Sequence, residues 1–210
     1  MRSNRRQFVV AGAAALALPA LAQPARVLAP MTEGPFYPPR AWREAWPDQD
    51  ADLTRVGSAR VAQGEHLGLE LVVRDARGRV IDGAEVEIWQ CDTRQQYRHP
   101  SQTLDPAQID AGFQGFGAAR SGSNGLLRFR TIKPVPYPGR TPHIHVKLRH
   151  ASFGEVTSQL FVDGDAGNAR DFLWRSLKPE DRVALAMRLQ PAAADSGLRW
   201  QARHALVVPT

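Results

Sequence analysis

The chain has 210 residues, of which 43% are hydrophobic, with five Trp and eight Phe, so it can bury a real core within one domain. Its formal charge is +6, but no stretch interleaves arginines with aromatic residues, so nucleic acid is not an expected partner. Cys91 is the only cysteine, which excludes an internal disulfide and a thiolate-based metal site.

Residues 1–22 predict a signal peptide. Arg5 and Arg6 precede an apolar run over residues 11–21 that is too short to span a bilayer comfortably, and Ala20-Leu21-Ala22 fits a cleavage site. The arginine pair resembles a twin-arginine export signal, and an ordinary secretory signal is the alternative. We therefore predict a periplasmic or secreted protein with no stable membrane anchor. Cleavage removes three arginines and no acidic residue, so the formal charge falls from +6 to +3.

Residues 23–60 are rich in proline and irregular in pattern. Pro35, Pro38 and Pro39 fall within eight residues, which is incompatible with a helix there. We expect an extended N-terminal arm over residues 23–60 that lies across a domain formed by residues 61–210.

The domain alternates strand patterns with turns. Residues 92–124 form a long polar stretch, which is typical of functional loops. Helical signals come late, over residues 165–177 and after Pro179. This order favours an all-β fold, namely a β-sandwich with long active-site loops and one or two short C-terminal helices. The expected strands are residues 66–74, 84–90, 126–132, 143–148, 156–162 and 200–208.

The most informative run is the strand that carries His143 and His145. Residues i and i+2 of a strand point to one face, so both imidazoles can reach one metal ion. No Asp or Glu lies in residues 137–148, so neither a zinc site nor an iron(II) site with a carboxylate is completed locally. The nearby oxygen donor is Tyr137, and Tyr97 is the other tyrosine of the domain. A phenol has a pKa of ~10, so its ionisation at neutral pH requires a strongly Lewis-acidic ion such as iron(III).

Several motifs occur in a specific order around these residues. With them, the chain resembles the intradiol ring-cleavage dioxygenases, closest to the protocatechuate 3,4-dioxygenase type. The resemblance covers roughly residues 30–165. The motifs are Gly34-Pro35-Phe36-Tyr37, Asp82-Gly83-Ala84, Tyr97-Arg98-His99-Pro100, Phe113-Gln114-Gly115-Phe116-Gly117, Tyr137-Pro138 and Arg140-Thr141-Pro142-His143-Ile144-His145.

The resemblance implies a cofactor, a reaction and roles for single residues. The cofactor is non-haem Fe(III), and the reaction cleaves catechol-type aromatics with O2 between the two hydroxylated carbons to give cis,cis-muconate-type diacids. Arg140 would lie beside the substrate, Gln159 matches a residue near the same pocket, and Tyr137 would also accept a substrate proton. The implied metal ligands are Tyr97, Tyr137, His143 and His145.

The chain departs from the family at two places. Only Pro138 and Gly139 separate Tyr137 from Arg140, which is shorter than in protocatechuate enzymes, so the substrate cannot be carried over. Catechol, protocatechuate, hydroxyquinol, lignin-derived and chlorinated catechols stay open. The helical dimerisation segment of catechol dioxygenases is absent, so a dimer built in that way is not expected. Because protocatechuate enzymes pair two related chains, a homo-oligomer and a hetero-oligomer both stay open.

Two other functions compete with this hypothesis. A non-catalytic β-sandwich module that binds aromatic or carbohydrate surfaces has the same expected fold, because sandwiches host many functions. A hydrolytic zinc enzyme fits less well, because no carboxylate that could serve as general base lies near the histidines.

Overall fold

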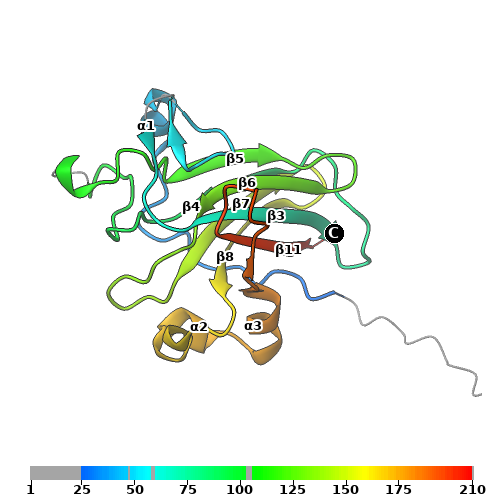
Figure 1. Cartoon of the computed structure of the whole chain (residues 1–210). Helices are drawn as coiled ribbons and strands as arrows, with labels where there is room; N and C mark the ends of the chain where they lie inside the picture. Colours follow the sequence, from blue (N-terminus) through cyan, green and yellow to red (C-terminus); the bar gives the residue numbers. More distant parts are fainter. Residues whose placement is uncertain (1–24, 47, 58–59, 103–105, 210) are drawn as a thin grey trace, which may run out of the picture.

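A computed structural model describes residues 25–46, 48–57, 60–102 and 106–209. The predicted signal peptide, residues 1–22, lies outside this part of the chain. Two β-sheets pack face to face, with the C-terminal helices at one side (Figure 1). The predicted all-β sandwich is therefore confirmed.

The first sheet has four strands in the order β10-β11-β3-β6. β11 runs parallel to β3, and the other neighbours are antiparallel. Long strands form here because apolar residues alternate with polar ones, as in the His66–Asp75 strand. The strand bounds are β3 His66–Asp75, β6 Leu126–Ile132, β10 Gln190–Pro191 and β11 Trp200–Val208.

The second sheet has five strands in the order β5-β4-β7-β8-β9. Its three central pairings are antiparallel and join β5, β4, β7 and β8, whereas β9 is parallel to β8. The strand bounds are β4 Glu85–Trp89, β5 Phe116–Arg120, β7 His143–His150, β8 Gly154–Val162 and β9 Ala186–Met187.

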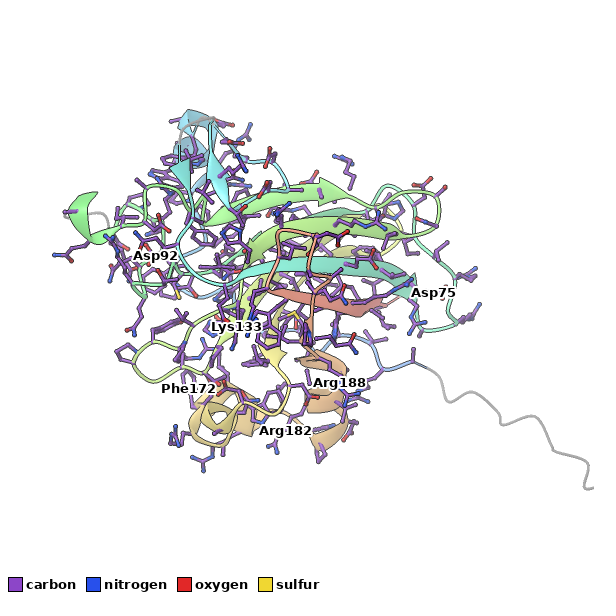
Figure 2. All side chains as sticks on the ribbon, in the orientation of Figure 1. Asp75, Asp92, Lys133, Phe172, Arg182 and Arg188 are labelled. Atoms are coloured by element: carbon purple, nitrogen blue, oxygen red, sulfur yellow. The ribbon has the colours of Figure 1, made fainter. Side chains whose placement is uncertain are left out.

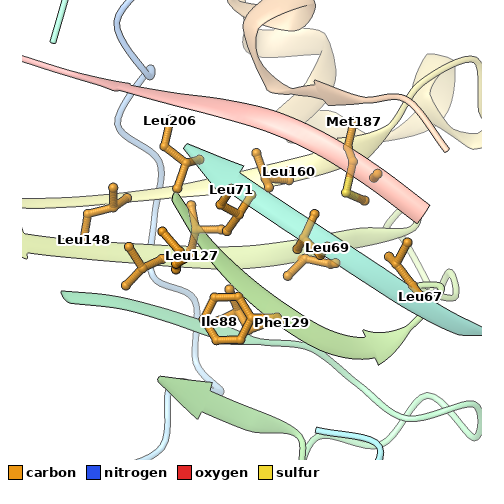
Figure 3. Packing of buried hydrophobic residues seen from close by; sticks show 14 of the residues in the cluster. Leu67, Leu69, Leu71, Ile88, Leu127, Phe129, Leu148, Leu160, Met187 and Leu206 are labelled. Atoms are coloured by element: carbon orange, nitrogen blue, oxygen red, sulfur yellow. The ribbon is translucent and has the colours of Figure 1, made fainter. Parts of the chain in front are cut away.

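The hydrophobic core lies between the two sheets (Figure 3). Leu69 and Leu71 of β3 enter it from one side, and Ile88 of β4 and Leu148 of β7 enter it from the other; all four are fully buried. Burial of one such side chain stabilises the fold by about 1.5–3 kcal/mol. The apolar positions of the predicted strands therefore face inward, and every second residue of β7 faces away from the core.

The arm is less extended than predicted. Residues 30–39 are non-helical, as the prolines require, but helix α1 follows at Arg40–Ala45. The carbonyl of Pro39 accepts the N–H groups of Trp42 and Arg43, which begins the helix. A small hairpin of β1 (Arg55–Val56) and β2 (Arg60–Val61) follows. The prediction of an extended arm over residues 23–60 is wrong for these segments, because a proline restricts only its own position and the preceding turn.

The C-terminal helices also differ from expectation. The predicted helix over residues 165–177 is divided into a 3-10 turn, Ala166–Arg170, and helix α2, Phe172–Ser176. The break lies at Asp171, which has extended backbone and accepts the first N–H groups of α2 with its side chain. Helix α3, Pro179–Leu185, begins with proline as predicted. Among the described residues, none of the helices has the length and apolar character of a membrane-spanning helix.

The expected long loop is interrupted as well. It contains a short 3-10 turn, Pro106–Gln108, and strand β5. Strand β5 was missed because Gly117, Ala118 and Ala119 give it no apolar alternation.

Candidate metal centre and substrate pocket

The candidate site lies on the outer face of the five-stranded sheet. The strand register places Trp89 beside His145 and His145 beside Gln159, on three adjacent strands. His143 lies two residues earlier on β7 and shares this face, whereas Ile144 between them enters the core. Both histidines are nevertheless buried, with 2% and 3% of their surface exposed. Something other than the opposite sheet must therefore cover them.

The N-terminal arm provides part of this cover. Gln159 donates to the carbonyl of Thr32 at 3.3 Å, and Phe36 stacks on Tyr97 with ring centroids 4.7 Å apart. A Cβ at Gly34 would lie in ordinary van der Waals contact with His145, 3.5 Å from its Cε1, so Gly34 lies directly over this ring. Its φ of +77° is what favours glycine. The Gly34-Pro35-Phe36-Tyr37 motif is thus the segment of the arm that closes the site.

A group of charged side chains holds the arm in place. The Glu87 carboxylate, 3% exposed, accepts from the Tyr37 hydroxyl at 2.6 Å and pairs with Arg43 at 2.8 Å and Arg149 at 2.9 Å. We call these four residues the arm anchor. Burial, together with the hydrogen bond to Glu87, raises the pKa of Tyr37 to about 12. The third tyrosine of the chain is therefore a structural hydrogen-bond donor outside the candidate metal site.

The four predicted ligand side chains come together in one place. The rings of His143 and His145 have centroids 4.9 Å apart, and Tyr137 lies 5.4 Å from His143. Tyr97 lies 5.8 Å from Tyr137 and 6.0 Å from His145. Tyr97 and Tyr137 come from loops, and the histidines from the start of β7. The structure thus brings two phenols and two imidazoles into mutual contact.

The imidazoles are oriented as metal ligands require. Nδ1 of His143 lies 2.6 Å from the carbonyl of Thr141, so Nδ1 carries the proton and Nε2 keeps its lone pair. Nε2 lies 3.4 Å from the Tyr97 hydroxyl oxygen. His145 stacks on Trp89, and its buried Nδ1 has no hydrogen-bond partner in the described part of the chain. A buried nitrogen without a partner is costly unless another group binds it.

The protonation states also favour a metal rather than a cationic histidine pair. Burial and the Arg140 charge lower the pKa of His143 to about 4, and burial and His143 hold the pKa of His145 well below its usual value. Burial raises the pKa of Tyr97 well above 10 and raises the pKa of Tyr137 as well. Both imidazoles are therefore neutral and can donate a lone pair to a metal ion. The phenols ionise only beside a strong positive charge.

The donor set discriminates among metals. Within residues 25–46, 48–57, 60–102 and 106–209, no three His, Cys, Asp or Glu side chains gather as a metal-binding group. The side-chain oxygens nearest to the two imidazoles in this cluster are the phenol oxygens of Tyr97 and Tyr137. Hard phenolate oxygens with two imidazoles suit a trivalent ion such as iron(III) better than zinc.

A cavity of about 370 Å³ opens beside these donors. Tyr137 and His145 reach its wall, whereas Tyr97, 2% exposed, and His143 do not. Phe172 and Leu173 of α2 form part of the wall and were missed by the sequence analysis, because nothing in their pattern separates them from the rest of a helix. The lining comprises Thr32, Gly34, Pro35, Phe36, Tyr137, Pro138, Gly139, Arg140, His145, Gln159, Phe172 and Leu173.

Arg140 and Gln159, predicted near the substrate, meet in this wall. Nη2 of Arg140 donates to the Gln159 side-chain oxygen at 2.5 Å, and Nη1 lies 3.5 Å from the Tyr137 hydroxyl. Nε of Arg140 donates to Asp171 at 2.8 Å. The guanidinium is therefore fixed at the edge of the cavity, next to one of the two phenols.

A larger cavity of about 850 Å³ lies on the outer face of the other sheet. Its charged side chains pair with one another, as Glu70 does with Arg128 at 2.8 Å and with Arg203 at 3.8 Å. It contains none of the tyrosine and histidine donors. We therefore assign the chemistry to the smaller cavity.

Comparisons with known proteins identify the family of the chain. A family model described as dioxygenase matches residues 32–203. The chain belongs to the intradiol ring-cleavage dioxygenase family. The protocatechuate 3,4-dioxygenase beta chain of Burkholderia cepacia is 32% identical over 160 residues, which cover 70% of this chain and 66% of that protein. A catechol 1,2-dioxygenase of Pseudomonas sp. (strain EST1001) is 29% identical over 183 residues, which cover 79% and 57%.

Solved structures share the fold. The dioxygenase domain of a dioxygenase carbohydrate-binding protein fusion from Streptomyces sp. SirexAA-E superposes with a TM-score of 0.64 at 27% identity, over 88% of this chain and 99% of that one. An intradiol ring-cleavage dioxygenase from Tetranychus urticae has a TM-score of 0.65 at 21% identity, over 88% and 95%. The chain spans about two thirds of the first curated relative and 57% of the second.

Proposed function

We propose that this chain is an exported non-haem iron(III) dioxygenase that cleaves catechol-type aromatics between their two hydroxylated carbons. The observation that carries the proposal is the meeting of Tyr97, Tyr137, His143 and His145 on one covered sheet face, beside a cavity. Both atoms of O2 would enter the two carboxyl groups of a cis,cis-muconate-type diacid. The reaction then consumes no outside reductant.

In this proposal the four side chains hold the ion. When bound, ferric iron supplies the Lewis acidity that ionises phenols and the electron-accepting character that activates a catechol toward O2. The chain's contribution is to present two neutral imidazoles and two phenols on a rigid base, and to exclude water with the arm. Trp89 fixes the ring of His145 by stacking, and the Thr141 carbonyl fixes the tautomer of His143.

The two tyrosines have different surroundings and therefore different proposed roles. Tyr97 is almost completely buried and stacked on Phe36, so it serves as a permanent ligand. Tyr137 lines the cavity and lies 3.5 Å from Nη1 of Arg140. Once ionised by a bound ferric ion, its phenolate oxygen could accept one proton of an incoming catechol, which would return Tyr137 to the neutral phenol.

Arg140 provides the positive charge of the cavity. Its guanidinium faces the space that the substrate's oxygens would occupy and stabilises negative charge that develops there. Gln159 fixes one end of this guanidinium through its side-chain oxygen. The remaining wall, with Pro35, Phe36 and Phe172, packs against an aromatic ring.

The chain offers a matched test because it has three tyrosines, of which two belong to the site. Purified protein is loaded with ferric iron, and its iron content and visible absorption are measured before and after anaerobic addition of catechols. We expect near-stoichiometric iron and a red-brown colour from phenolate-to-iron charge transfer, with a shift on catechol binding. Tyr97→Phe and Tyr137→Phe should weaken or alter the band, whereas Tyr37→Phe should preserve it.

The result also separates the competing functions. A protein that stays colourless with iron and consumes no O2 with any catechol would overturn the dioxygenase proposal and favour the non-catalytic binding module. A protein that binds zinc tightly and rejects iron would favour the hydrolytic alternative. Product analysis with the catechol that is consumed tests the muconate-type diacid directly.

Export is the second part of the proposal. Arg5-Arg6 and the following apolar run support a twin-arginine signal that ends near Ala22. We expect the N-terminus of the exported protein to lie at about residue 23, and Arg5→Lys with Arg6→Lys to retain the protein inside the cell. Export that continues unchanged in this double variant would contradict the twin-arginine route and favour an ordinary secretory signal.

A further inference from the structure

Asp171 occupies a junction that the sequence analysis did not assign. Its side chain is 1% exposed, and its two carboxylate oxygens serve different segments. One oxygen accepts the N–H groups of Leu173 at 2.9 Å and Trp174 at 3.0 Å. The other accepts from Nε of Arg140 at 2.8 Å and from the N–H of Thr141 at 2.9 Å. A single carboxylate thus joins the start of α2 to the loop that precedes β7.

The contact with Asp171 fixes the position of the Arg140 guanidinium, which has no other salt-bridge partner among the described residues. The Arg140 side chain is 9% exposed, and Asp171 is its salt-bridge partner. A buried guanidinium without a carboxylate is strongly unfavourable, so this pair determines where the charge can lie. Of the five N–H groups of a guanidinium, Asp171, Gln159 and Tyr137 account for three. For the other two, the described part of the chain shows no hydrogen-bond partner, and the side chain lines the cavity.

The contact with α2 fixes the facing wall. Asp171 is the N-cap of this helix, so it determines where Phe172 and Leu173 project. Both side chains line the cavity, and the Arg140 guanidinium lies 5.7 Å from the Phe172 ring centroid. Figure 2 labels Phe172 at the start of this helix, beside the loop before β7. The charged and apolar parts of the wall therefore depend on the same carboxylate.

The same junction extends to a metal ligand. Thr141 donates its N–H to Asp171 and accepts the Nδ1 proton of His143 with its carbonyl. Because the Asp171 carboxylate already accepts four hydrogen bonds, it has no lone pair left to accept one from the substrate. It therefore acts through Arg140 and the loop, not by touching the reacting atoms.

We propose that Asp171 is a positioning residue for ring cleavage, which sets the Arg140 guanidinium in the orientation that stabilises developing negative charge. This inference rests on the proposed dioxygenase function. Asp171→Asn separates its two roles, because asparagine caps a helix about as well as aspartate. The oxygen that caps α2 is then retained, whereas an NH2 group, which donates, replaces the charged oxygen that accepts from Arg140 and Thr141.

Asp165→Asn is the matched control. Asp165 caps the preceding 3-10 turn by accepting from Gly167 at 2.7 Å, and it also accepts from the Thr141 hydroxyl at 3.3 Å. It makes the same kind of cap one turn earlier on the same segment and has no hydrogen bond to Arg140. Asp165→Asn should therefore leave kcat within about threefold of wild type, which is under 1 kcal/mol.

The test is a double-mutant cycle with Arg140→Gln, read as kcat and KM for catechol, as thermal unfolding, and as the Kd for 4-nitrocatechol without O2. We expect Asp171→Asn to lower kcat by roughly 10–100-fold, a part of the ~100–1,000-fold cost of losing a preorganised charge-stabilising donor. KM should change little. The unfolding temperature should fall, because Arg140 loses its buried carboxylate, so kcat is measured at a temperature where the variant is fully folded. In the Arg140→Gln background, the same substitution should have almost no further effect on kcat or Kd.

Each outcome decides one question. If Asp171→Asn behaves like Asp165→Asn, or lowers kcat equally with and without Arg140, the positioning role is overturned while the dioxygenase function stands. If the loss of activity disappears at temperatures where Asp171→Asn is fully folded, the residue is merely structural. If wild-type protein neither binds nor cleaves a catechol, the proposed function itself fails, and the positioning role fails with it.

Discussion

The two faces of strand β7 are buried for different reasons. Ile144, Val146 and Leu148 point between the sheets, where they pack against apolar neighbours. His143, His145 and Lys147 alternate with them, point to the other face, and are just as inaccessible. An ordinary sandwich leaves its outer faces to water, with polar side chains there exposed. Here the arm covers the outer face.

This difference separates stability from function. Apolar burial on the inner face stabilises the fold, by about 25 cal/mol per Å² of apolar surface removed from water. The outer face buries neutral imidazoles, phenols and ion pairs, each of which must regain its lost hydration through specific partners. The Lys147–Glu33 ion pair and the arm anchor supply such partners, whereas Nδ1 of His145 lacks one among the described residues. A face built in this way suggests chemistry rather than packing.

The largest expected effect comes from removing one candidate metal ligand, His145, from the outer face. His145→Phe keeps a ring that can stack on Trp89 but supplies no nitrogen. We expect ferric iron affinity and ring cleavage to fall at least about 100-fold, because even groups that only orient metal ligands contribute about 10–100-fold. Iron analysis and O2 consumption measure the effect.

The control for this change lies at the far end of the same strand. His150 is partly exposed and forms a hydrogen bond with Ser152 at 2.9 Å. His150→Phe should leave iron binding unchanged. Equal losses in the two variants would show that the effect comes from strand distortion, and would contradict a ligand role for His145.

The neighbouring residue tests the inner face. Ile144 is fully buried in the core, so Ile144→Ala should lower the free energy of unfolding by about 2–5 kcal/mol through lost burial and a cavity. Chemical denaturation of the metal-free protein measures this loss. The iron content of the folded protein should stay near that of wild type, and its loss at a normal unfolding free energy would mean that the two faces are not independent.

The third prediction concerns the arm anchor. Glu87→Gln keeps the shape of the side chain but leaves Arg43 and Arg149 without their shared buried carboxylate. We expect a loss of roughly 1–3 kcal/mol in unfolding free energy and faster hydrogen exchange in residues 28–46, because a buried unsatisfied partner costs about that much.

An exposed ion pair on helix α1, which also carries Arg43, provides the comparison. Glu44 pairs with Arg40 at 2.7 Å, but their side chains are 61% and 85% exposed. Glu44→Gln should change stability by less than about 0.5 kcal/mol. If the two variants have the same effect, Glu87 does not anchor the arm.

Sequence patterns anticipated the inner face far better than the outer one. Alternation of apolar residues located β6 and β11 to the residue, because burial between sheets leaves a period-two signal. Strand β5 was missed for want of that signal. The break at Asp171 was missed although aspartate is a favoured N-cap residue. Its second partner, Arg140, lies 31 residues away. No local pattern reports such a contact.

The candidate site was anticipated unequally as well. Residue spacing alone indicated only the His143 and His145 pair, because a strand guarantees their common face. Tyr137 was indicated by its position beside the histidines, and Tyr97 as the other tyrosine of the domain. Their assignment as ligands rested on the family resemblance, since both lie on loops whose paths are set by distant contacts. The arm anchor was not anticipated at all, because it joins Tyr37 to Glu87 across 50 positions. The ligand roles themselves stay predictions until metal is measured.

The smallest expected effect concerns the pH dependence of the arm. The pKa of Tyr37 is raised to about 12, mainly by burial and by its hydrogen bond to Glu87, whereas a tyrosine in an unfolded chain ionises near pH ~10. The protonated hydroxyl is the form that the fold favours, so its contribution is fully present below about pH 10 and is lost as the pH rises toward 12. Wild type should therefore exceed Tyr37→Phe in unfolding free energy by about 1 kcal/mol at pH 8 and converge with it over this window. Denaturant titrations of both metal-free proteins test this, since Tyr97 and Tyr137 occur in both and cancel in the difference. A difference that is constant up to pH 12, or that disappears below pH 10, would show that the Tyr37 hydroxyl does not hold the arm through Glu87.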